Sequence, residues 1–278
     1  MAPQNPYLSA ELEWLCNTPD LMLPPHSQTR PSALQQPVTD STALETTYEP
    51  SHRLGDHFEN LVFQYLNCNT QVTDIKRNIQ IHEDLKTLGE IDFLVQLQHH
   101  WLHLEVALKL YLLDGTGDSL THFIGTRRDD RLANKWHHML DKQLHLSNRP
   151  EAKYELAALG IEQPVDTALW VKGWLFYRQG KIPGNLPAPV NPQHSHGWWI
   201  TQAELSWLKQ ADHRFLLPSK MQWLLPPSLI DPPLLDFAGL VDRVMGSQRS
   251  LLALVVDAEG RERSRGFIVP DQWPESRL

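Results

Sequence analysis

Charged side chains interrupt two strongly apolar stretches of the sequence, at a spacing that suggests a shared site. Asp92 lies within GEIDFLV, residues 89–95, and Glu105 and Lys109 lie within WLHLEVALKLYLL, residues 101–113. An unpaired ion in a buried strand is costly to desolvate, so these charges require a physical reason. Since alternate residues of a strand share a face, pairing of the two strands would bring the three charged groups together.

Two carboxylates and a lysine on one face of a sheet are suited to cleaving a phosphodiester. Carboxylate oxygens are hard ligands of the kind that Mg²⁺ or Mn²⁺ prefers. Asp92 and Glu105 are therefore predicted metal ligands and catalytic residues, and Lys109 could hold a phosphate oxygen or orient a water. The alternative is that these charges form salt bridges, with Arg77 among the candidates, that only tie the strands together.

Two further groups of charged residues could contribute to the same site. Glu59 lies beside the apolar stripe of a predicted helix over about residues 53–67, where it could either assist the site or be a solvated boundary residue. The segment GTRRDDRLANK, residues 125–135, surrounds a predicted helix start with cations that could bind phosphate, although a solvated helix end with local ion pairs is the alternative. These cations are Arg127, Arg128, Arg131 and Lys135.

The elements that must position these residues follow from hydrophobic periodicity. A helix over about 53–67 precedes three strands joined by short turns, which predicts an antiparallel meander. A helix that Asp129 or Asp130 caps, and then a strand over 169–178, should follow. The predicted strands are RNIQIHE (77–83), EIDFLVQL (90–97) and WLHLEVALKLYLL (101–113), with turns at KTLGE and QHH.

Composition divides the chain into three regions. Residues 1–52 are rich in Pro, Ser, Thr and Gln and should wrap around the body, with only a short helix at about 9–16. Residues 53–182 should form the α/β core. Residues 183–278 are rich in Pro and Trp, and we expect a C-terminal extension that packs on the core through Trp and Leu side chains.

The overall charge limits the classes of function. A net charge of −8 over 278 residues argues against non-specific coating of nucleic acid, because such binding requires a broad basic surface, but it permits a small basic site. No segment has the apolar length of a membrane span and the start does not resemble a signal peptide, so a cytoplasmic protein without membrane contact is expected. The oligomeric state does not follow from the sequence.

The combination of these motifs resembles a known group of proteins. The helix with Glu59, the strand with Asp92 and the strand with Glu105 and Lys109 resemble the core of the PD-(D/E)XK nuclease superfamily. Nearly the whole chain also resembles an uncharacterised bacterial family, domain of unknown function 1853, through GEIDFLV, HLEVALKLYL, FIGTRRDDRLANK, HGWWI, FLLPSKMQWL and RGFIVPDQW. The resemblance implies a restriction-endonuclease-like α/β fold and a Mg²⁺-dependent hydrolase that cleaves DNA or RNA.

The sequence departs from the superfamily pattern at the lysine. The usual acid-x-Lys motif separates the two residues by ~7 Å along a strand, whereas Glu105 and Lys109 are four residues apart, or ~13 Å. Ala107 occupies the position expected for the acid. Two interpretations remain open: a nuclease with a displaced acid, and a catalytically inactive member of the fold that binds nucleic acid or a protein partner.

Overall fold

The structure, a computed structural model, describes residues 6–36, 53–84, 86–128, 130–231 and 233–273. Its α-helices are α1 (Pro6–Asn17), α2 (Leu54–Asn67), α3 (Leu132–Asp141), α4 (Ala152–Ala158) and α5 (Phe237–Val244). Its strands are β1 (Val72–Glu83), β2 (Lys86–Leu97), β3 (His100–Leu113), β4 (Phe123–Gly125), β5 (Val165–Arg178), β6 (His196–Thr201), β7 (Arg214–Leu216), β8 (Leu251–Val256) and β9 (Glu262–Val269).

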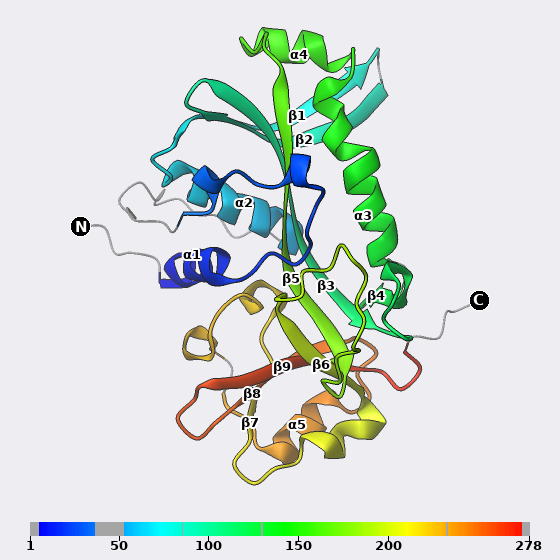
Figure 1. Ribbon diagram of the computed structural model, residues 1–278. Helices are drawn as coiled ribbons and strands as arrows, with labels where there is room; N and C mark the ends of the chain where they lie inside the picture. Colours follow the sequence, from blue (N-terminus) through cyan, green and yellow to red (C-terminus); the bar gives the residue numbers. More distant parts are fainter. Residues whose placement is uncertain (1–5, 37–52, 85, 129, 232, 274–278) are drawn as a thin grey trace.

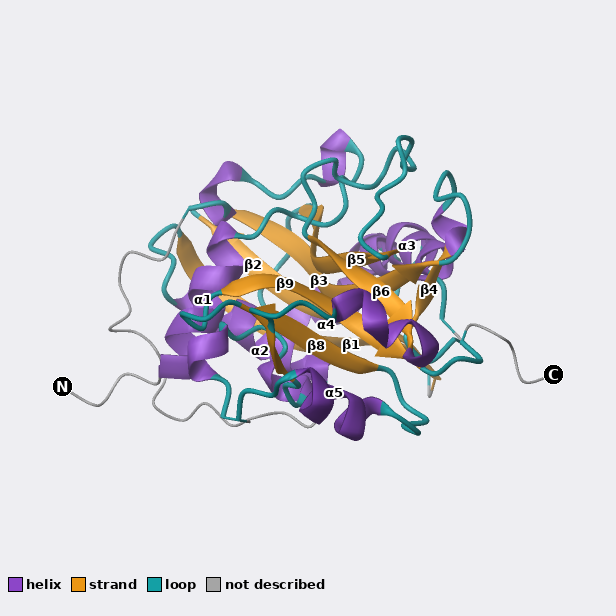
Figure 2. Cartoon of the chain, turned by 90° about the horizontal axis from the view of Figure 1, so that it is seen from below, coloured by secondary structure: helices purple, strands orange, loops and turns teal. Residues whose placement is uncertain are grey.

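These strands form one mixed sheet of nine strands that helices flank, so the protein is of the α/β type (Figures 1 and 2). The order is β1-β2-β3-β5-β6-β9-β8-β7, and β4 pairs with the end of β3. The first three strands are the predicted antiparallel meander. The central strands β3, β5, β6 and β9 are parallel, and β8 and β7 add antiparallel pairs at the far edge.

Two local predictions are wrong. The β1–β2 turn does not lie in KTLGE, because Asp84 has a positive φ of 54° that reverses the chain earlier and leaves residues 86–90 in β2. The helix α3 has Arg131 at its N-cap and no side-chain cap. Asp130 instead accepts a hydrogen bond of 2.8 Å from the Tyr111 hydroxyl, while Asp129 lies outside the described residues.

The two faces of the sheet carry different helices. On one face, even-numbered residues of β3 such as Leu104 and Val106 pack with α1 and α2. On the other face, odd-numbered residues such as Ala107 and Tyr111 pack with α3, while the 3₁₀-helix η4 (Gln143–Asn148) and α4 cover the meander. The alternation that the sequence predicts for β3 therefore places Glu105, Ala107 and Lys109 on the α3 side.

The residues after 183 continue the same sheet. The strand β6 pairs in parallel with the end of β5, and β9 pairs with β6. Trp198 and Trp199 of β6 are buried on opposite faces, Trp198 with α5 and Trp199 with the cluster that contains α2. In Figure 1 this C-terminal part forms the lower end of the molecule.

The N-terminal segment runs along β5, where the Leu21 N–H donates a 2.7 Å bond to the Val171 carbonyl, and ion pairs hold it there. The Lys172 side chain of β5 is only 2% exposed, and its Nζ lies 3.0 Å from Asp20 Oδ1 and donates to the Thr18 carbonyl. Asp20 also pairs with Arg30 at 3.3 Å, and the Arg30 guanidinium lies 4.0 Å from the centroid of the Trp170 ring. One carboxylate of the N-terminal segment therefore neutralises a buried strand lysine.

Gly173 of β5 allows the central strands to approach closely beside Lys109. Its φ is +133°, and a Cβ at this position would lie 1.8 Å from the Lys109 carbonyl oxygen. Any other residue would clash with the main chain of β3 and would also be strained.

We therefore expect Gly173→Ala to lower the free energy of unfolding by at least about 3 kcal/mol, because the backbone of β3 cannot move away without losing its pairs with β5. Urea unfolding followed by circular dichroism measures this. Gly184→Ala is the matched control, since a Cβ there meets nothing within 4 Å, and its effect should stay within about 0.5 kcal/mol. Equal stability of the two variants would contradict the close approach.

Candidate active site

Asp92 and Glu105 bind each other's strands through the main chain. The Asp92 Oδ2 atom accepts a 2.9 Å hydrogen bond from the Val106 N–H, and Glu105 Oε1 accepts a 3.3 Å bond from the Asp92 N–H. The regular β2–β3 register ends one residue earlier, at the pair Phe93–Leu104. Side-chain carboxylates thus replace carbonyl oxygens as acceptors at the point where the two strands separate.

This separation leaves part of β3 without a neighbour on one side. The strand β5 pairs with β3 from Trp101 to Leu112, whereas on the opposite edge β2 stops at Leu104 and β4 begins at Tyr111. Among the described residues, no strand pairs with residues 105–110 on that edge. We call this stretch the open edge of β3, and the two acids lie at one end of it.

Glu105 is held by side chains from η4 and from its own strand. Its Oε1 lies 2.7 Å from His103 Nε2, and its Oε2 accepts a 2.7 Å bond from Gln143 Nε2. His103 Nδ1 lies 2.9 Å from the Ser147 hydroxyl. Burial lowers the pKa of His103 to about 3, so the ring is neutral. A neutral ring protonated on Nε2 donates to Glu105 and accepts from Ser147, which fixes the carboxylate.

The two acids favour the protonated state when no cation is present. Burial, followed by the charge of Glu105, raises the pKa of Asp92 to about 8. Burial likewise raises the pKa of Glu105 to about 7, although hydrogen bonds from Asp92 oppose the shift. Both raised pKa values indicate that the two carboxylates lie close together and that no Lys or Arg side chain among the described residues neutralises them.

Glu59 and Glu90 extend the acidic group. Burial raises the pKa of Glu59 to about 7, with further contributions from the charges of Asp92, Asp56, Glu90 and Glu105. Glu59 lies on α2 and therefore approaches the acids from the opposite side of the sheet. Glu90 accepts from the side chains of Asn78 and Gln80 at 3.2 and 3.4 Å.

Asn78 has an unusual backbone conformation next to the acids. It lies between the pairs Arg77–Phe93 and Ile79–Ile91, opposite Asp92, and its φ is +56°. A strained non-glycine residue in a strand is often found at functional sites. Regular pairing is thus interrupted on both sides of Asp92.

Lys109 is half-buried on the open edge and has no anionic partner in contact. No carboxylate of the described residues lies within 4.0 Å of its Nζ. Burial and the charge of Lys135 lower its pKa, while Asp130, Asp92 and Glu59 oppose that shift. The lysine therefore shares one electrostatic environment with the predicted acids without forming the salt bridge that a purely structural role would require.

The basic segment divides into residues with different environments. Arg131 donates a 2.8 Å bond to the Thr121 carbonyl, which ties the start of α3 to the preceding turn. Arg128 has a positive φ of 75° and engages other groups. Arg127 and Lys135 have no carboxylate within 4.0 Å among the described residues. The last two remain candidates for phosphate binding.

Sequence reasoning did not assign His103 or Gln143 to the site. His103 lies two residues before Glu105, so the two-residue period of a strand would have placed it on the same face. Gln143 and Ser147 lie in η4, far along the chain, and no local pattern marks them as partners of Glu105.

The carboxylates of Asp92 and Glu105 fit a magnesium site in which the protein supplies only a few of the ligands. Asp92 Oδ2 and Glu105 Oε2 each accept one hydrogen bond, which leaves a lone pair on each oxygen. Mg²⁺ is often held by one or two carboxylates, with waters and phosphate oxygens completing the octahedron. In the described parts of the chain, no group of three or more His, Cys, Asp or Glu side chains is arranged to hold a metal ion. These residues therefore do not fit a metal site in which side chains supply every ligand.

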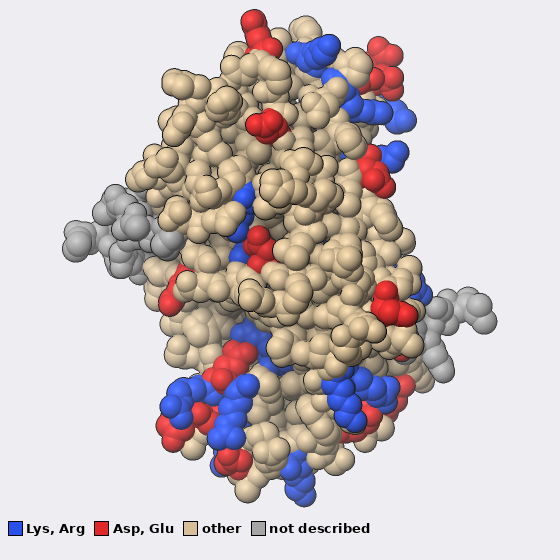
Figure 3. Space-filling view, in the orientation of Figure 1, with Lys and Arg blue, Asp and Glu red and all other residues tan. Residues whose placement is uncertain are grey.

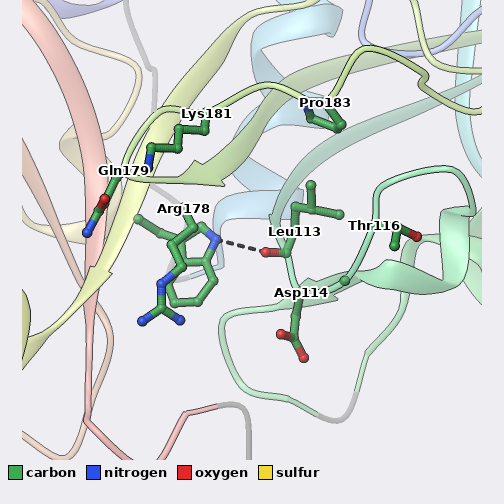
Figure 4. Close-up of a pocket in the computed structure, with 9 residues that line it drawn as sticks. Leu113, Asp114, Thr116, Arg178, Gln179, Lys181 and Pro183 are labelled. Carbon is green, nitrogen blue, oxygen red and sulfur yellow. Dashed lines mark hydrogen bonds between the residues drawn. The ribbon is translucent and has the colours of Figure 1, made fainter.

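A separate cavity of about 330 Å³ lies near the carboxyl ends of β3 and β5. Figure 4 shows Arg178, Gln179 and Lys181 on one side and Leu113, Asp114 and Thr116 on the other. Arg178 pairs with Glu204 at 2.8 Å, and the Trp199 indole donates to the Leu113 carbonyl. Glu204 thus already neutralises the arginine of this cavity, and the acids of the open edge do not line it.

The face seen in Figure 3 carries no broad basic surface. Lys and Arg side chains alternate with Asp and Glu side chains, mainly over the lower end of the molecule, and the middle of this face is mostly uncharged. This distribution agrees with the net charge of −8.

The comparisons with known proteins identify a family. Residues 10–269 match the family described as domain of unknown function (DUF1853), and the chain belongs to that family. No curated protein and no solved structure matches the chain. Within the described ranges, no helix has both the length and the apolar character needed to cross a membrane.

The raised pKa of Asp92 predicts how stability depends on pH. Because its folded-state pKa of about 8 exceeds the ordinary value of 3.8, the folded protein retains a proton that the unfolded chain releases. The stabilising effect of that proton is full below the unfolded pKa and is lost as pH rises through about 8. Between pH 5 and 9, the metal-free protein should therefore lose stability, and Asp92→Asn should flatten this profile.

Urea midpoints in EDTA across that range measure the effect. At pH 9, Asp92→Asn should be at least as stable as the parent, since the amide can still accept from Val106. Asp242→Asn, an exposed change on α5, is the control and should leave the slope unaltered. A variant that is less stable than the parent at pH 9 would show that the Asp92 charge holds the strands together.

Proposed function

We propose that this protein is a divalent-cation-dependent phosphodiesterase of the PD-(D/E)XK type that cleaves nucleic acid, DNA or RNA, in the cytoplasm. The observation that carries the proposal is the reciprocal binding of Asp92 and Glu105 across β2 and β3 at one end of an open strand edge. Lys109, without an ion pair, lies further along the same edge. Acids with raised pKa values beside a cation that forms no ion pair are typical of catalytic sites.

The order of elements supports a restriction-endonuclease-like core. The helix α2, the meander β1-β2-β3, the helix α3 and the parallel strand β5 follow one another as the resemblance requires. The acids lie on the second and third strands and Glu59 lies on the preceding helix. These placements agree with the roles that the resemblance implies for Asp92, Glu105 and Glu59.

In this proposal each residue has a distinct task. Asp92 and Glu105 would hold Mg²⁺ or Mn²⁺, which when bound stabilises the negative charge that develops on the attacked phosphate. His103 and Gln143 keep the Glu105 carboxylate in one orientation, so little reorganisation is needed. Lys109 would contact a phosphate oxygen or orient the attacking water, and Glu59 would assist from α2.

A second candidate is a non-catalytic protein that binds nucleic acid or a protein partner along the same edge. The observation that favours it is the absence of a lysine or acid at Ala107, which leaves Lys109 four residues from Glu105. Along a strand this separation is ~13 Å, twice the usual spacing of the two groups. In this case the acids and Lys109 would recognise a ligand without cleaving it.

The proposal predicts separable effects of the acids and of the lysine. Mg²⁺ or Mn²⁺ should raise the melting temperature of the parent, and Glu105→Gln should abolish both this rise and cleavage, because it removes a ligand. Lys109→Ala should retain the rise and reduce cleavage by about 10²-fold or more, as loss of one charge-stabilising group does. Cleavage is measured on labelled single- and double-stranded DNA and RNA.

Lys153→Ala on α4 is the matched control, because it removes an exposed lysine far along the chain from the site. It should keep both the metal-induced shift and the cleavage rate. A parent that shows neither a melting shift nor cleavage with either cation would exclude the phosphodiesterase. Binding of nucleic acid without cleavage would then favour the non-catalytic candidate.

A further inference from the structure

Four cations near the open edge form two like-charged pairs without contacting anions. Lys109 lies within reach of the Lys135 charge, and Arg127 lies within reach of the Lys220 charge. No carboxylate of the described residues lies within 4.0 Å of any of the four. Like charges held close together repel each other, and an anion bound between them offsets this repulsion. The second pair lies outside the constellation that the sequence predicted, because Lys220 belongs to the C-terminal region.

Lys220 is held in place by a well-defined local structure. The 3₁₀-helix η6 (Lys220–Gln222) begins with a capping box in which Ser219 and Gln222 bond each other, at 2.9 and 3.0 Å. The carbonyl of the following Trp223 accepts a 2.6 Å bond from Arg265 of β9. The helix η6 packs against α2, the helix that carries Glu59. The C-terminal strands therefore hold Lys220 against the core helix of the candidate site.

Arg127 is brought to the same place by the end of β4. The strand β4 pairs with Tyr111–Leu113, and the chain then turns through a 2.8 Å bond from the Arg128 N–H to the Gly125 carbonyl. The Ser250 hydroxyl, just before β8, donates a 3.2 Å bond to the Thr126 carbonyl. The turn with Arg127 is thus tied to the C-terminal region, and both Arg127 and Lys220 are exposed.

The open edge of β3 connects these cations to the acids. Glu105 lies at one end, and Tyr111, where β4 begins to pair, lies at the other. Six residues of an extended strand span ~20 Å. Lys109 lies between the two ends. The distance exceeds the size of one phosphate group, so the cations at the β4 end cannot act on the same phosphate as Asp92 and Glu105.

From this arrangement we infer that Arg127 and Lys220 together bind a second phosphate of a polynucleotide strand that lies along the open edge, several nucleotides from the Asp92–Glu105 pair. The inference deepens the proposed function and rests on it for the identity of the ligand. It specifies the substrate class as a strand of several nucleotides and excludes a mononucleotide or a simple phosphate ester. Burial and the charge of Arg127 lower the pKa of Lys220, in agreement with a cation pair that lacks its anion.

Binding without metal tests this inference separately from cleavage. We expect Arg127→Ala/Lys220→Ala to bind a fluorescein-labelled 12-nucleotide single strand in EDTA roughly tenfold more weakly than the parent, as measured by fluorescence anisotropy. The slope of log affinity against log salt should fall by about 1.4, because two contacts each contribute about 0.7 for single strands. The parent should bind a labelled dinucleotide far more weakly than the 12-mer, since a dinucleotide is too short to reach both ends of the edge.

Lys153→Ala/Arg243→Ala is the matched control, because it removes one exposed lysine and one exposed arginine from α4 and α5. It should bind both oligonucleotides as the parent does. Parent-like affinity and salt slope of the Arg127/Lys220 variant would overturn the inference, even if the parent cleaves nucleic acid. Equal affinity of the parent for the 12-mer and the dinucleotide would also overturn it. If the double variant shows the expected loss of affinity but the parent cleaves no nucleic acid, the inference is supported and the nuclease is refuted. Repeating the assay with RNA and DNA strands shows which of the two the protein prefers.

Discussion

The structure of the candidate site depends on one exchange of hydrogen-bond acceptors between β2 and β3. At Asp92 and Glu105 the carboxylates accept the N–H groups of Val106 and Asp92, where a regular sheet would use carbonyl oxygens. The exchange satisfies the main chain while the strands separate, so the sheet can end its pairing without an unsatisfied buried group. It also places the two acids side by side, and burial together with the charge of Glu105 raises the pKa of Asp92.

The separation is tolerated because the other edge of β3 is fully paired. The strand β5 continues beside β3 past the open edge, and Gly173 permits the closest approach next to Lys109. A strand that is free on one edge but fixed on the other can present its backbone and side chains without losing its place in the sheet. The site is therefore built on a rigid element rather than on a loop.

Local patterns in the sequence determine those parts of the structure that were predicted correctly. Alternation placed Glu105 and Lys109 on one face of a strand, and the apolar stripe of α2 predicted a helix that the structure begins at Leu54. The partners of Glu105 could not be predicted in this way, because Gln143 reaches it from 38 residues away. The electrostatic interaction between Lys220 and Arg127 joins residues that are further apart still in the sequence. The turn was predicted at the glycine of KTLGE. It lies earlier because Asp84, a non-glycine residue, adopts a positive φ and reverses the chain there.

The ion pair between Asp20 of the N-terminal segment and Lys172 of β5 limits where the chain can be shortened. Lys172 lies in the central strand β5, yet its counter-ion, Asp20, comes from an N-terminal segment whose described residues, 6–36, contribute no strand to the sheet. A chain shortened to begin at α2 would keep every described strand but would lose both the carboxylate and the Thr18 carbonyl that bind Lys172 beside Trp170. Removing one partner of a buried ion pair typically costs about 3–5 kcal/mol. The segment with Asp20 therefore belongs to the folded core, although the described strands and the candidate catalytic residues all lie after it.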